Sequence, residues 1–284
     1  MPKGRPRLGI LYDEAAKYSP SNIEAIELFR ESAFNHGLHP MMLLKDDIEY
    51  LDQCSGLFIR DTTHPNNYTY QFATRAEQLK IPCIDSSINI MRGCNKIWQW
   101  ECFKKYNIPH LNTQLIFPHA NIELDYPCVL KIPDSCFSQG VFLVNNKYEL
   151  LKLLKSNSEI NTQLLMQPYM PTEFDWRICI FKRKILFVVK YYMADDDWKI
   201  IKYDRQGGYI NGRHEAITNL SLPIYHAANQ CLQFLDNGLY GIDIKEINHQ
   251  PYVIEINDNP SIDHGIEDTI KEDKVYDTII RSFT

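Results

Sequence analysis

The sequence predicts a mixed α/β (α+β) fold, and three observations support this expectation. Strands and helices alternate over roughly the first 90 residues, later strands come in hairpin pairs, and the composition is that of a globular protein. Hydrophobic residues make up 44% and charged residues 23% of the 284 residues, which are ordinary proportions. This length suffices for one large core or for two to three smaller units.

The first part of the chain predicts a small α/β layer. Apolar runs predict strands at 7–12, 39–44, 56–59 and 81–85. Apolar side chains at helical spacing predict helices from Ser21 to about His36, closed by Gly37, and near 68–79. The order strand, helix, strand, strand, helix, strand is typical of a layered α/β unit, to which we assign residues 1–90.

The rest of the chain predicts helices and hairpins. Helices are expected at 87–107, 147–156, 224–237 and 266–281. Strands are expected at 128–132, 141–144 and 163–167, and hairpins at 177–191 and 241–260. We expect boundaries near 87–95 and 165–170, which divides this part into residues 91–166 and 167–284.

The hairpin at 241–260, GIDIKEINHQPYVIEINDNP, is expected to bring two acids together. Folded about His249, it sets Asp243 directly opposite Glu255, since the two are equally far from the turn. Because side chains alternate along a strand, Asp243, Glu255 and Asn257 should share one face. The other face should carry Ile242, Ile244, Ile254 and Ile256.

Facing carboxylates need an explanation, because two of them about 5 Å apart repel by roughly 3 kcal/mol at an effective dielectric near 20. Either both acids are solvated on an exposed face, or a divalent cation lies between them. Mg²⁺ prefers hard oxygen ligands, and the amide of Asn257 adds an oxygen without a third negative charge. Asp243, Glu255 and Asn257 are therefore a candidate site for one or two Mg²⁺ (or Mn²⁺) ions. Two carboxylates alone hold Mg²⁺ weakly, so the metal should arrive with a nucleotide.

This segment, GID followed by VIEINDNPSID, resembles the C-terminal signature of ATP-grasp ligases, particularly the RimK-like branch. CNKIWQWECFKKYNIP (94–109) and YPCVLKIP (126–133) resemble the helix and the strand that carry the two ATP lysines. LLMQPYMPTEFDWRI (164–178) resembles the strand and hinge that hold adenine. The resemblance covers roughly 95–270, and 58–77 also looks like the preceding RimK-like segment. It implies an ATP-grasp fold, two α+β subdomains gripping ATP after a small pre-ATP-grasp domain.

The resemblance implies that five residues of these segments bind ATP. Lys96 and Lys131 match the phosphate-binding lysines. Backbone groups near Pro168 and Tyr169 match the adenine contacts, and Asp175 falls where the family places a carboxylate near the ribose. Taken singly, such residues are more often solvated lysines or turn residues.

The resemblance also implies residues that act on the reacting groups. Arg177 matches a family arginine that faces phosphate or substrate, although alone it is equally consistent with a surface ion pair. Lys190 is a further phosphate or substrate candidate, with plain surface exposure as its alternative. His214 and His264 are candidates for proton transfer, with ordinary surface histidines preferred. Arg60, Asp61, Thr62 and Thr63 are candidates for the acceptor pocket.

The chain departs from the family pattern in two regions. The phosphate loop PDSCFSQG (133–140) keeps only Gly140, with Ser135, Ser138 and Gln139 as remaining donors. Residues 193–215 match nothing clearly: Asp195–Asp197 predict a solvated tip, while Arg205 and Arg213 receive no firm role.

The implied activity is ATP-dependent ligation of a carboxylic acid to an amine through an acyl phosphate, releasing ADP and phosphate. The amine would belong to an amino acid, a peptide or a protein tail, and glutamate is one candidate for the added group. Two alternatives stay open: an ATP-grasp enzyme with another acceptor, and a nucleotide-binding regulatory protein without turnover. The sparse glycines of the phosphate loop motivate the last.

Composition bears on location and partners. The net charge of −6 argues against a nucleic-acid backbone or an anionic membrane as the main partner. We find no signal peptide and no apolar run near 18 residues, and expect a cytoplasmic protein, with a homo-oligomer as one open alternative for its assembly. Eight cysteines without zinc-ligand spacing are typical of reduced thiols, several of them in the core.

Overall fold

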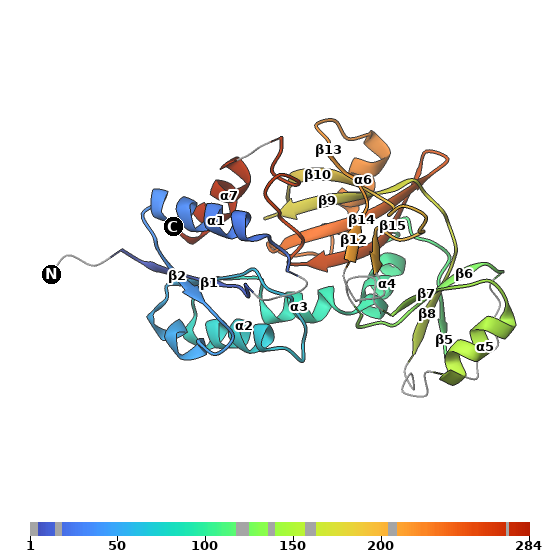
Figure 1. Ribbon diagram of the computed structural model, residues 1–284, viewed down its shortest axis with the longest axis horizontal. Coiled ribbons are helices and arrows are strands. Elements are labelled where there is room, and N and C mark those ends of the chain that lie inside the picture. The colour runs from blue at the N-terminus through green and yellow to red at the C-terminus, as the bar shows by residue number, and fades with distance from the viewer. Residues whose placement is uncertain are drawn as a thin grey trace.

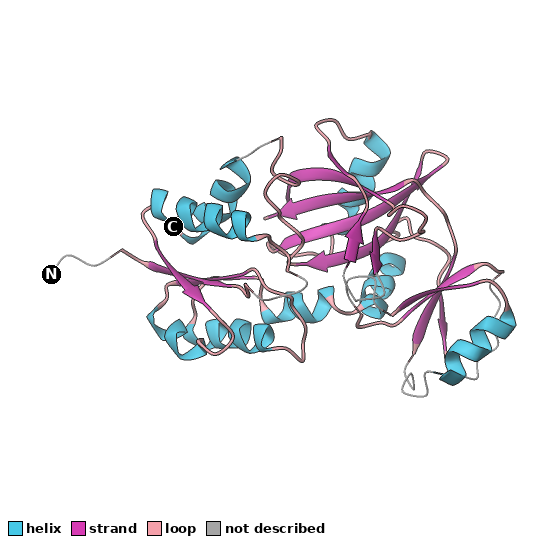
Figure 2. Cartoon of the chain, viewed as in Figure 1, coloured by secondary structure: helices cyan, strands magenta, loops and turns pink. Residues whose placement is uncertain are grey.

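The computed structural model describes residues 5–14, 19–117, 125–135, 140–156, 163–203, 209–270 and 273–284. Three main sheets follow one another along the chain, and helices cover their outer faces (Figures 1 and 2). The sheets span residues 7–84, 114–168 and 174–258. The division into the three units expected from the sequence stays a prediction.

The first sheet is parallel and has helices on both faces. Its strands are β1 (Arg7–Leu11), β2 (His39–Leu43), β3 (Gly56–Ile59) and β4 (Cys83–Ile84), in the order β2-β1-β3-β4. One face packs against α1 (Ile23–Asn35) and the C-terminal α7 (Asp273–Ile280), the other against α2 (Tyr68–Leu79) and α3 (Ser87–Gly93) (Figure 1). The short η1 (Ile48–Gln53) precedes β3, and η2 (Arg281–Phe283) follows α7. Asn22 and Asn67 cap α1 and α2 by accepting backbone N–H bonds.

The second sheet also has four strands and is antiparallel. It has the order β5-β8-β6-β7, formed by β5 (Gln114–Ile116), β6 (Cys128–Lys131), β7 (Val141–Val144) and β8 (Leu164–Pro168). The helix α5 (Lys147–Ser156) packs on this sheet through the fully buried Leu150. Lys131 is the last residue of β6 and lies in the wall of the cavity that is described below.

The third sheet is the largest and is also antiparallel, in the order β13-β10-β9-β14-β15. Its strands are β9 (Phe174–Phe181), β10 (Lys184–Tyr192), β13 (His214–Ala216), β14 (Leu239–Ile247) and β15 (Gln250–Asp258). One face is apolar and packs against α4 (Lys96–Lys105) and α6 (Leu222–Cys231). A separate two-stranded ribbon consists of β11 (Ile201–Tyr203) and β12 (Tyr209–Asn211).

The predicted hairpin forms, and Asp243 pairs directly with Glu255 between β14 and β15 as predicted. The expectation for Ile254 is wrong. The register shifts between Asp243 and Ile244, so that Ile244 faces Val253. Ile254 is the extra residue of this bulge and lines a cavity instead of the core.

Three predicted helices differ from the observed ones, among them the helix expected at 224–237, which is observed as α6 and ends at Cys231. The helix expected at 87–107 is two helices, because α3 ends at Gly93 and Asn95 caps α4 by accepting from Trp98 N. The helix expected at 266–281 is shorter, since residues 264–270 form turns and α7 begins at Asp273. Periodicity alone does not detect a capping residue inside an apolar pattern.

Several cysteines lie in the core as expected: Cys128, Cys179 and Cys231 are fully buried. In the part of the chain that the structure describes, no helix is both long enough and apolar enough to span a bilayer.

Candidate functional site

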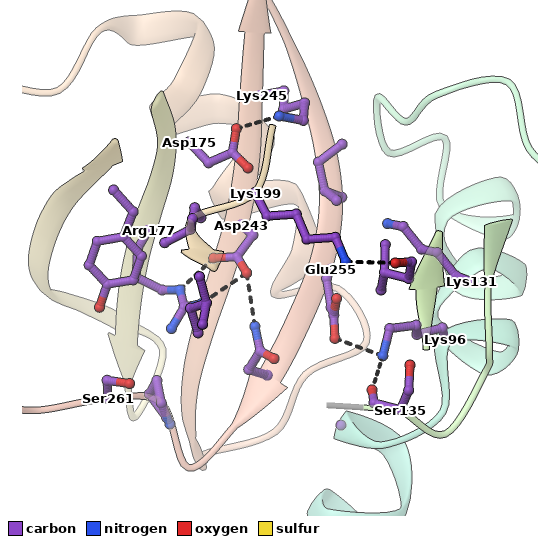
Figure 3. Close-up of a pocket in the computed structure, with 18 of the residues that line it drawn as sticks. Lys96, Lys131, Ser135, Asp175, Arg177, Lys199, Asp243, Lys245, Glu255 and Ser261 are labelled. Atoms are coloured by element: carbon purple, nitrogen blue, oxygen red, sulfur yellow. Dashed lines mark hydrogen bonds and ion pairs between the residues drawn. The ribbon is translucent and has the colours of Figure 1, made fainter. Parts of the chain in front are cut away.

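A cavity of about 300 Å³ lies where the three sheets meet, and its wall includes Thr63, Lys131 and Arg177, one from each unit. The residues predicted for nucleotide and metal binding line this one cavity: Lys96, Lys131, Pro168, Tyr169, Asp175, Asp243, Glu255 and Asn257. Arg177 lines it as well (Figure 3). Segments that are far apart in the sequence are thus brought together.

The metal-candidate residues lie on the face of the third sheet opposite α4 and α6, in one row across three strands. Asp243 on β14 pairs with Arg177 on β9 and with Glu255 on β15. Arg177 forms a two-pronged ion pair with Asp243, whose Oδ2 lies 2.9 Å from Nη2. Gly241 leaves room for the arginine, since a Cβ there would lie 2.9 Å from Arg177 Cδ. Asn257 Nδ2 donates to the same Asp243 oxygen at 3.0 Å.

Lys96 approaches Glu255 from the opposite side of the cavity. It is the first residue of α4, is buried, and its Nζ lies 3.0 Å from Glu255 Oε1. Lys96 also donates to the carbonyl of Ser135 in the phosphate loop. Gln99 fixes this helix on β15, because its side chain donates to Ile256 O at 2.7 Å and accepts from Ile256 N at 2.9 Å. The break at Asn95 therefore places Lys96 at the site.

Lys131 enters the cavity from β6 and forms no ion pair or hydrogen bond among the described residues (Figure 3). Burial lowers its pKa to about 8, and the charges of Lys96 and Lys245 act in the same direction while Glu255 opposes them. A buried ammonium without a partner favours an anionic ligand.

Asp175 and Lys245 form a second charged pair beside the first row. Their Oδ1 and Nζ atoms lie 2.7 Å apart, and Thr172 Oγ1 donates to the same Asp175 oxygen at 2.9 Å. Pro168 and Tyr169 line the neighbouring end of the cavity, where the ring of Tyr169 packs edge-on against Trp198 with centroids 5.8 Å apart.

The structure does not bring Lys190 to the cavity. In β10 it alternates with Val189 and Tyr191, so its side chain lies on the other face and pairs in register with Trp176. Its Nζ lies 4.4 Å from the ring centroid of Phe174 and 5.0 Å from that of Trp176. These cation–π contacts fit a structural role at the sheet surface.

The histidines separate into one that lines the cavity and one that does not. His214 on β13 lies in the wall, and its ring packs edge-on against Tyr191 with centroids 4.7 Å apart. Burial, together with the charge of Arg177, lowers the pKa of His214, which keeps the imidazole neutral at pH 7. His264 pairs instead with the buried Asp268 at 2.7 Å.

Arg60, a candidate for the acceptor pocket, does not line the cavity but forms buried hydrogen bonds within the protein. It is fully buried and donates to Pro20 O, to Ser21 Oγ, to Asn259 Oδ1 and, at 3.0 Å, to Pro260 O. The arginine thereby ties the first unit to the segment after β15. The adjacent Thr62 and Thr63 do line the cavity, whereas Asp61 accepts from the hydroxyl of Tyr68.

The structure describes only part of the unassigned segment 193–215 and of the phosphate loop 133–140. Asp195 and Asp196 are exposed, as expected for a solvated tip. Ser138, Gln139 and Arg205 lie outside the described residues. Arg213 contacts the face of the Tyr192 ring at 3.8 Å from its centroid.

Several cavity residues escaped the sequence reasoning, among them Lys245, Lys199 and Asp258. Lys245 lies two residues after Asp243 and therefore shares its face, so strand alternation would have found it. Lys199 reaches across the cavity mouth and donates to Val141 O at 2.7 Å, but it follows an unmatched segment (Figure 3). Asp258 lines the cavity although it alternates with Asn257, and burial raises its pKa to about 8, with a further contribution from Asp85.

Comparisons with known proteins identify the family. The family described as RimK-like ATP-grasp domain matches residues 106–282, which is more than half of the 284-residue chain. The chain belongs to the RimK-like ATP-grasp family. A probable α-L-glutamate ligase from Maridesulfovibrio salexigens is 21% identical over 206 residues. That match covers 68% of this chain and 64% of the relative, slightly less than two thirds of its length.

Solved structures show that the fold is ATP-grasp. An ATP-grasp RimK domain protein from Sphaerobacter thermophilus has a TM-score of 0.74 at 14% identity, covering 97% of this chain and 98% of that one. The D-alanine–D-alanine ligase from Bacillus anthracis complexed with ATP has a TM-score of 0.70 at 18% identity, covering 98% and 97%. The ATP-grasp fold predicted from the sequence is confirmed.

The donor set of the cavity fits a magnesium nucleotide. Among the described side chains, no three His, Cys, Asp or Glu gather in a way that would hold a metal ion by themselves. Asp243 and Glu255 supply two carboxylates and Asn257 an amide on one face, which leaves coordination positions for phosphate oxygens. Lys131, with which no described residue forms an ion pair, provides a cation for those phosphates. The side chains therefore suit Mg²⁺ together with ATP better than Mg²⁺ alone.

Proposed function

We propose that this RimK-like chain is an ATP-dependent ligase that joins a carboxylic acid to an amine, releasing ADP and phosphate. One observation carries the proposal: Asp243, Glu255 and Asn257 share a cavity with Lys96 and Lys131 in an ATP-grasp fold. The glutamate-ligase name of the curated relative supports an amino acid as one of the substrates.

The proposed roles follow from position and charge. Lys96 and Lys131 hold the phosphates, while Tyr169 and the backbone at Pro168 contact the base and Asp175 contacts the ribose. Asp243, Glu255 and Asn257 hold one or two Mg²⁺ ions, which would supply positive charge for the phosphoryl group in flight.

Arg177 orients the reacting carboxylate. It lies beside Asp243 and over the Tyr191 ring, 5.0 Å from its centroid, and pairing with Asp243 raises its pKa although burial alone would lower it. The guanidinium therefore stays charged, as needed to position an acid for attack on the γ-phosphorus. His214, neutral at pH 7, accepts a proton from the incoming amine.

The test is release of phosphate from Mg-ATP in the presence of pooled carboxylic acids and amines, with mass spectrometry of the products. A ligase releases phosphate only when both an acid and an amine are present, and the mass of the product equals the sum of the two minus water. Glu255→Gln should abolish release. Glu246→Gln is the matched control, because Glu246 lies on the same hairpin but accepts from Trp176 Nε1 at 3.0 Å outside the cavity. A melting temperature raised by Mg-ATP without acceptor-dependent release would instead support a regulatory nucleotide-binding protein.

A further inference from the structure

The ion pair of Asp175 with Lys245 belongs to a closed set of hydrogen bonds that also includes Thr172 (Figure 3). Lys245 Nζ donates to Asp175 Oδ1 and to Thr172 Oγ1, both at 2.7 Å. The hydroxyl of Thr172 donates in turn to the same Asp175 oxygen at 2.9 Å. These three residues, the Asp175–Lys245 cluster, therefore hold an ammonium group and a carboxylate side by side.

The cluster leaves one donor and one acceptor for a ligand. An ammonium group carries three N–H donors, and Lys245 uses two of them within the cluster. Both bonds to Asp175 end at Oδ1, and no described residue donates to Oδ2. Unlike the enclosed Oδ2 of Asp258, this oxygen is not sealed off by the protein. Asp175 and Lys245 both line the cavity, with 12% and 16% of their side chains exposed.

The cluster lies between the two ends of the proposed nucleotide site. Asp175 and Lys245 are each two residues along the strand from Arg177 and Asp243, so they form the next row on the same face of the sheet. On the other side, the threonine of the cluster lines a common groove with Tyr169, which is at the end proposed for the base. Because the sugar of a nucleotide connects its base to its phosphates, the cluster lies where a bound nucleotide would place its sugar.

We propose that Asp175 and Lys245 together bind a vicinal diol, so that this chain selects ribonucleotides over deoxyribonucleotides. One sugar hydroxyl donates to Asp175 Oδ2, and the neighbouring hydroxyl accepts from Lys245 Nζ. This inference rests on the proposed function, because it concerns the sugar of the nucleotide in the same site. A site that bonds a hydroxyl discriminates against an analogue without it, since a charged group is then left without its partner. Lys245, which matched no motif in the sequence, is thereby a specificity-determining residue.

The test is isothermal titration calorimetry with Mg²⁺ and one of three probes: ADP, 2′-deoxy-ADP or 3′-deoxy-ADP. The probes share the base and the phosphates, so any difference in affinity reports the sugar hydroxyls. We expect each deoxy form to bind the wild type about tenfold or more weakly than ADP, because each lacks one hydrogen bond to a charged group.

Lys245→Met should weaken ADP by about tenfold or more. It should also bring ADP and one of the two deoxy forms to within about twofold of each other, because the hydroxyl that bonded Lys245 no longer contributes. A structural or purely electrostatic role would instead weaken all three probes by the same factor. Lys184→Met is the matched control, since Lys184 is an exposed lysine of β10 in the same sheet and does not line the cavity. Its affinities for the three probes should equal those of the wild type.

Three results would overturn the inference: the wild type binds all three probes alike, it binds none of them, or Lys245→Met keeps the wild-type ratios of affinity. The first two comparisons use the wild type, so they decide even if the variant does not fold. Phosphate release is measured separately. Discrimination against the deoxy forms without acceptor-dependent release would contradict the proposed ligase and leave the diol site intact. Acceptor-dependent release with the same KM for ATP, 2′-deoxy-ATP and 3′-deoxy-ATP would do the reverse.

Discussion

Asp243 and Glu255 lie directly opposite each other on β14 and β15, and each is paired with a cation from a different part of the chain. Arg177 reaches Asp243 from β9, and Lys96 reaches Glu255 from α4. These two cations offset the repulsion between the facing acids. The acids are nevertheless held at the cavity with their oxygens on one face, as a magnesium nucleotide requires.

Replacing either acid should remove activity while the fold survives. We expect Asp243→Asn and Glu255→Gln to lower acceptor-dependent phosphate release by about 10²-fold or more, because each loses a charged ligand at the developing phosphoryl charge. Phosphate release and the magnesium concentration for half-maximal rate are the measurements. Wild-type rates in both variants at unchanged magnesium dependence would show that these acids do not hold the metal.

Lys131→Met should weaken nucleotide binding and at the same time raise the stability of the protein. Removing the unpaired cation should weaken an ATP analogue by about tenfold or more, since a charge-assisted contact with phosphate is lost. The same change should stabilise the protein by about 2 kcal/mol, because a buried ammonium without a partner is replaced by an apolar side chain of similar length. Titration calorimetry and urea unfolding give the two values.

Lys104→Met is the control for that substitution, since Lys104 is paired with Glu101 on the exposed side of α4. Both measured quantities should stay near the wild-type values. A Lys131→Met protein that binds nucleotide normally would remove Lys131 from the phosphate site.

Arg60→Met should destabilise the protein strongly. The substitution leaves at least four buried acceptors without their donor, which predicts a loss of about 3–5 kcal/mol in the free energy of unfolding. Urea unfolding checks this value. Arg75→Met, at an exposed arginine paired with Asp52, should cost less than about 1 kcal/mol. Near-native stability of Arg60→Met together with a raised KM for the acceptor would instead favour the acceptor role expected from the sequence.

The buried Asp85 should make stability depend on pH. Burial raises its pKa from 3.8 to about 6, although the backbone N–H groups of Leu239 and Asn259 donate to it. Because the folded state binds this proton more tightly, the group contributes stability below about pH 4, and the contribution is lost as pH rises through about 6. The loss amounts to roughly 3 kcal/mol.

Asp85→Asn removes the titrating proton, so the fall in unfolding free energy between pH 4 and pH 6.5 should be smaller than in the wild type. Urea unfolding across that range, with the exposed Asp46→Asn as control, measures the difference. If the unfolding free energy changes with pH equally in the wild type and in Asp85→Asn, Asp85 has the same pKa in the folded and the unfolded state.

The fold could be predicted from the sequence where local rules act alone. The pairing of Asp243 with Glu255 agrees with the prediction, although the turn lies between Ile247 and Gln250 and the bulge at Ile254 completes the match. Strands such as β3 and β7 follow from apolar runs. The bulge at Ile254 and the cap at Asn95 could not be predicted, because each is a single-residue feature within a continuous pattern. Both affect the site: the bulge turns Ile254 toward the cavity, and the cap places Lys96 at the start of α4.

Candidate site residues could be predicted where the family motif and the alternation of side chains along a strand point to the same face. Asp175 and Arg177 share a face of β9, whereas Lys190 lies between two residues of the opposite face and the resemblance did not reveal this. Partners that come from distant segments leave no local pattern. The ion pair of Lys96 with Glu255 and the buried contacts of Arg60 with Asn259 and Pro260 depend on how the units pack.

The most direct test of the central claim is a crystal structure with Mn²⁺ and a nonhydrolysable ATP analogue, using anomalous scattering to locate the metal. We expect metal density within about 2.1 Å of oxygens from Asp243 and Glu255, with Asn257 nearby and the phosphates against Lys96 and Lys131. Nucleotide bound outside this cavity, or a metal remote from both carboxylates, would contradict the account.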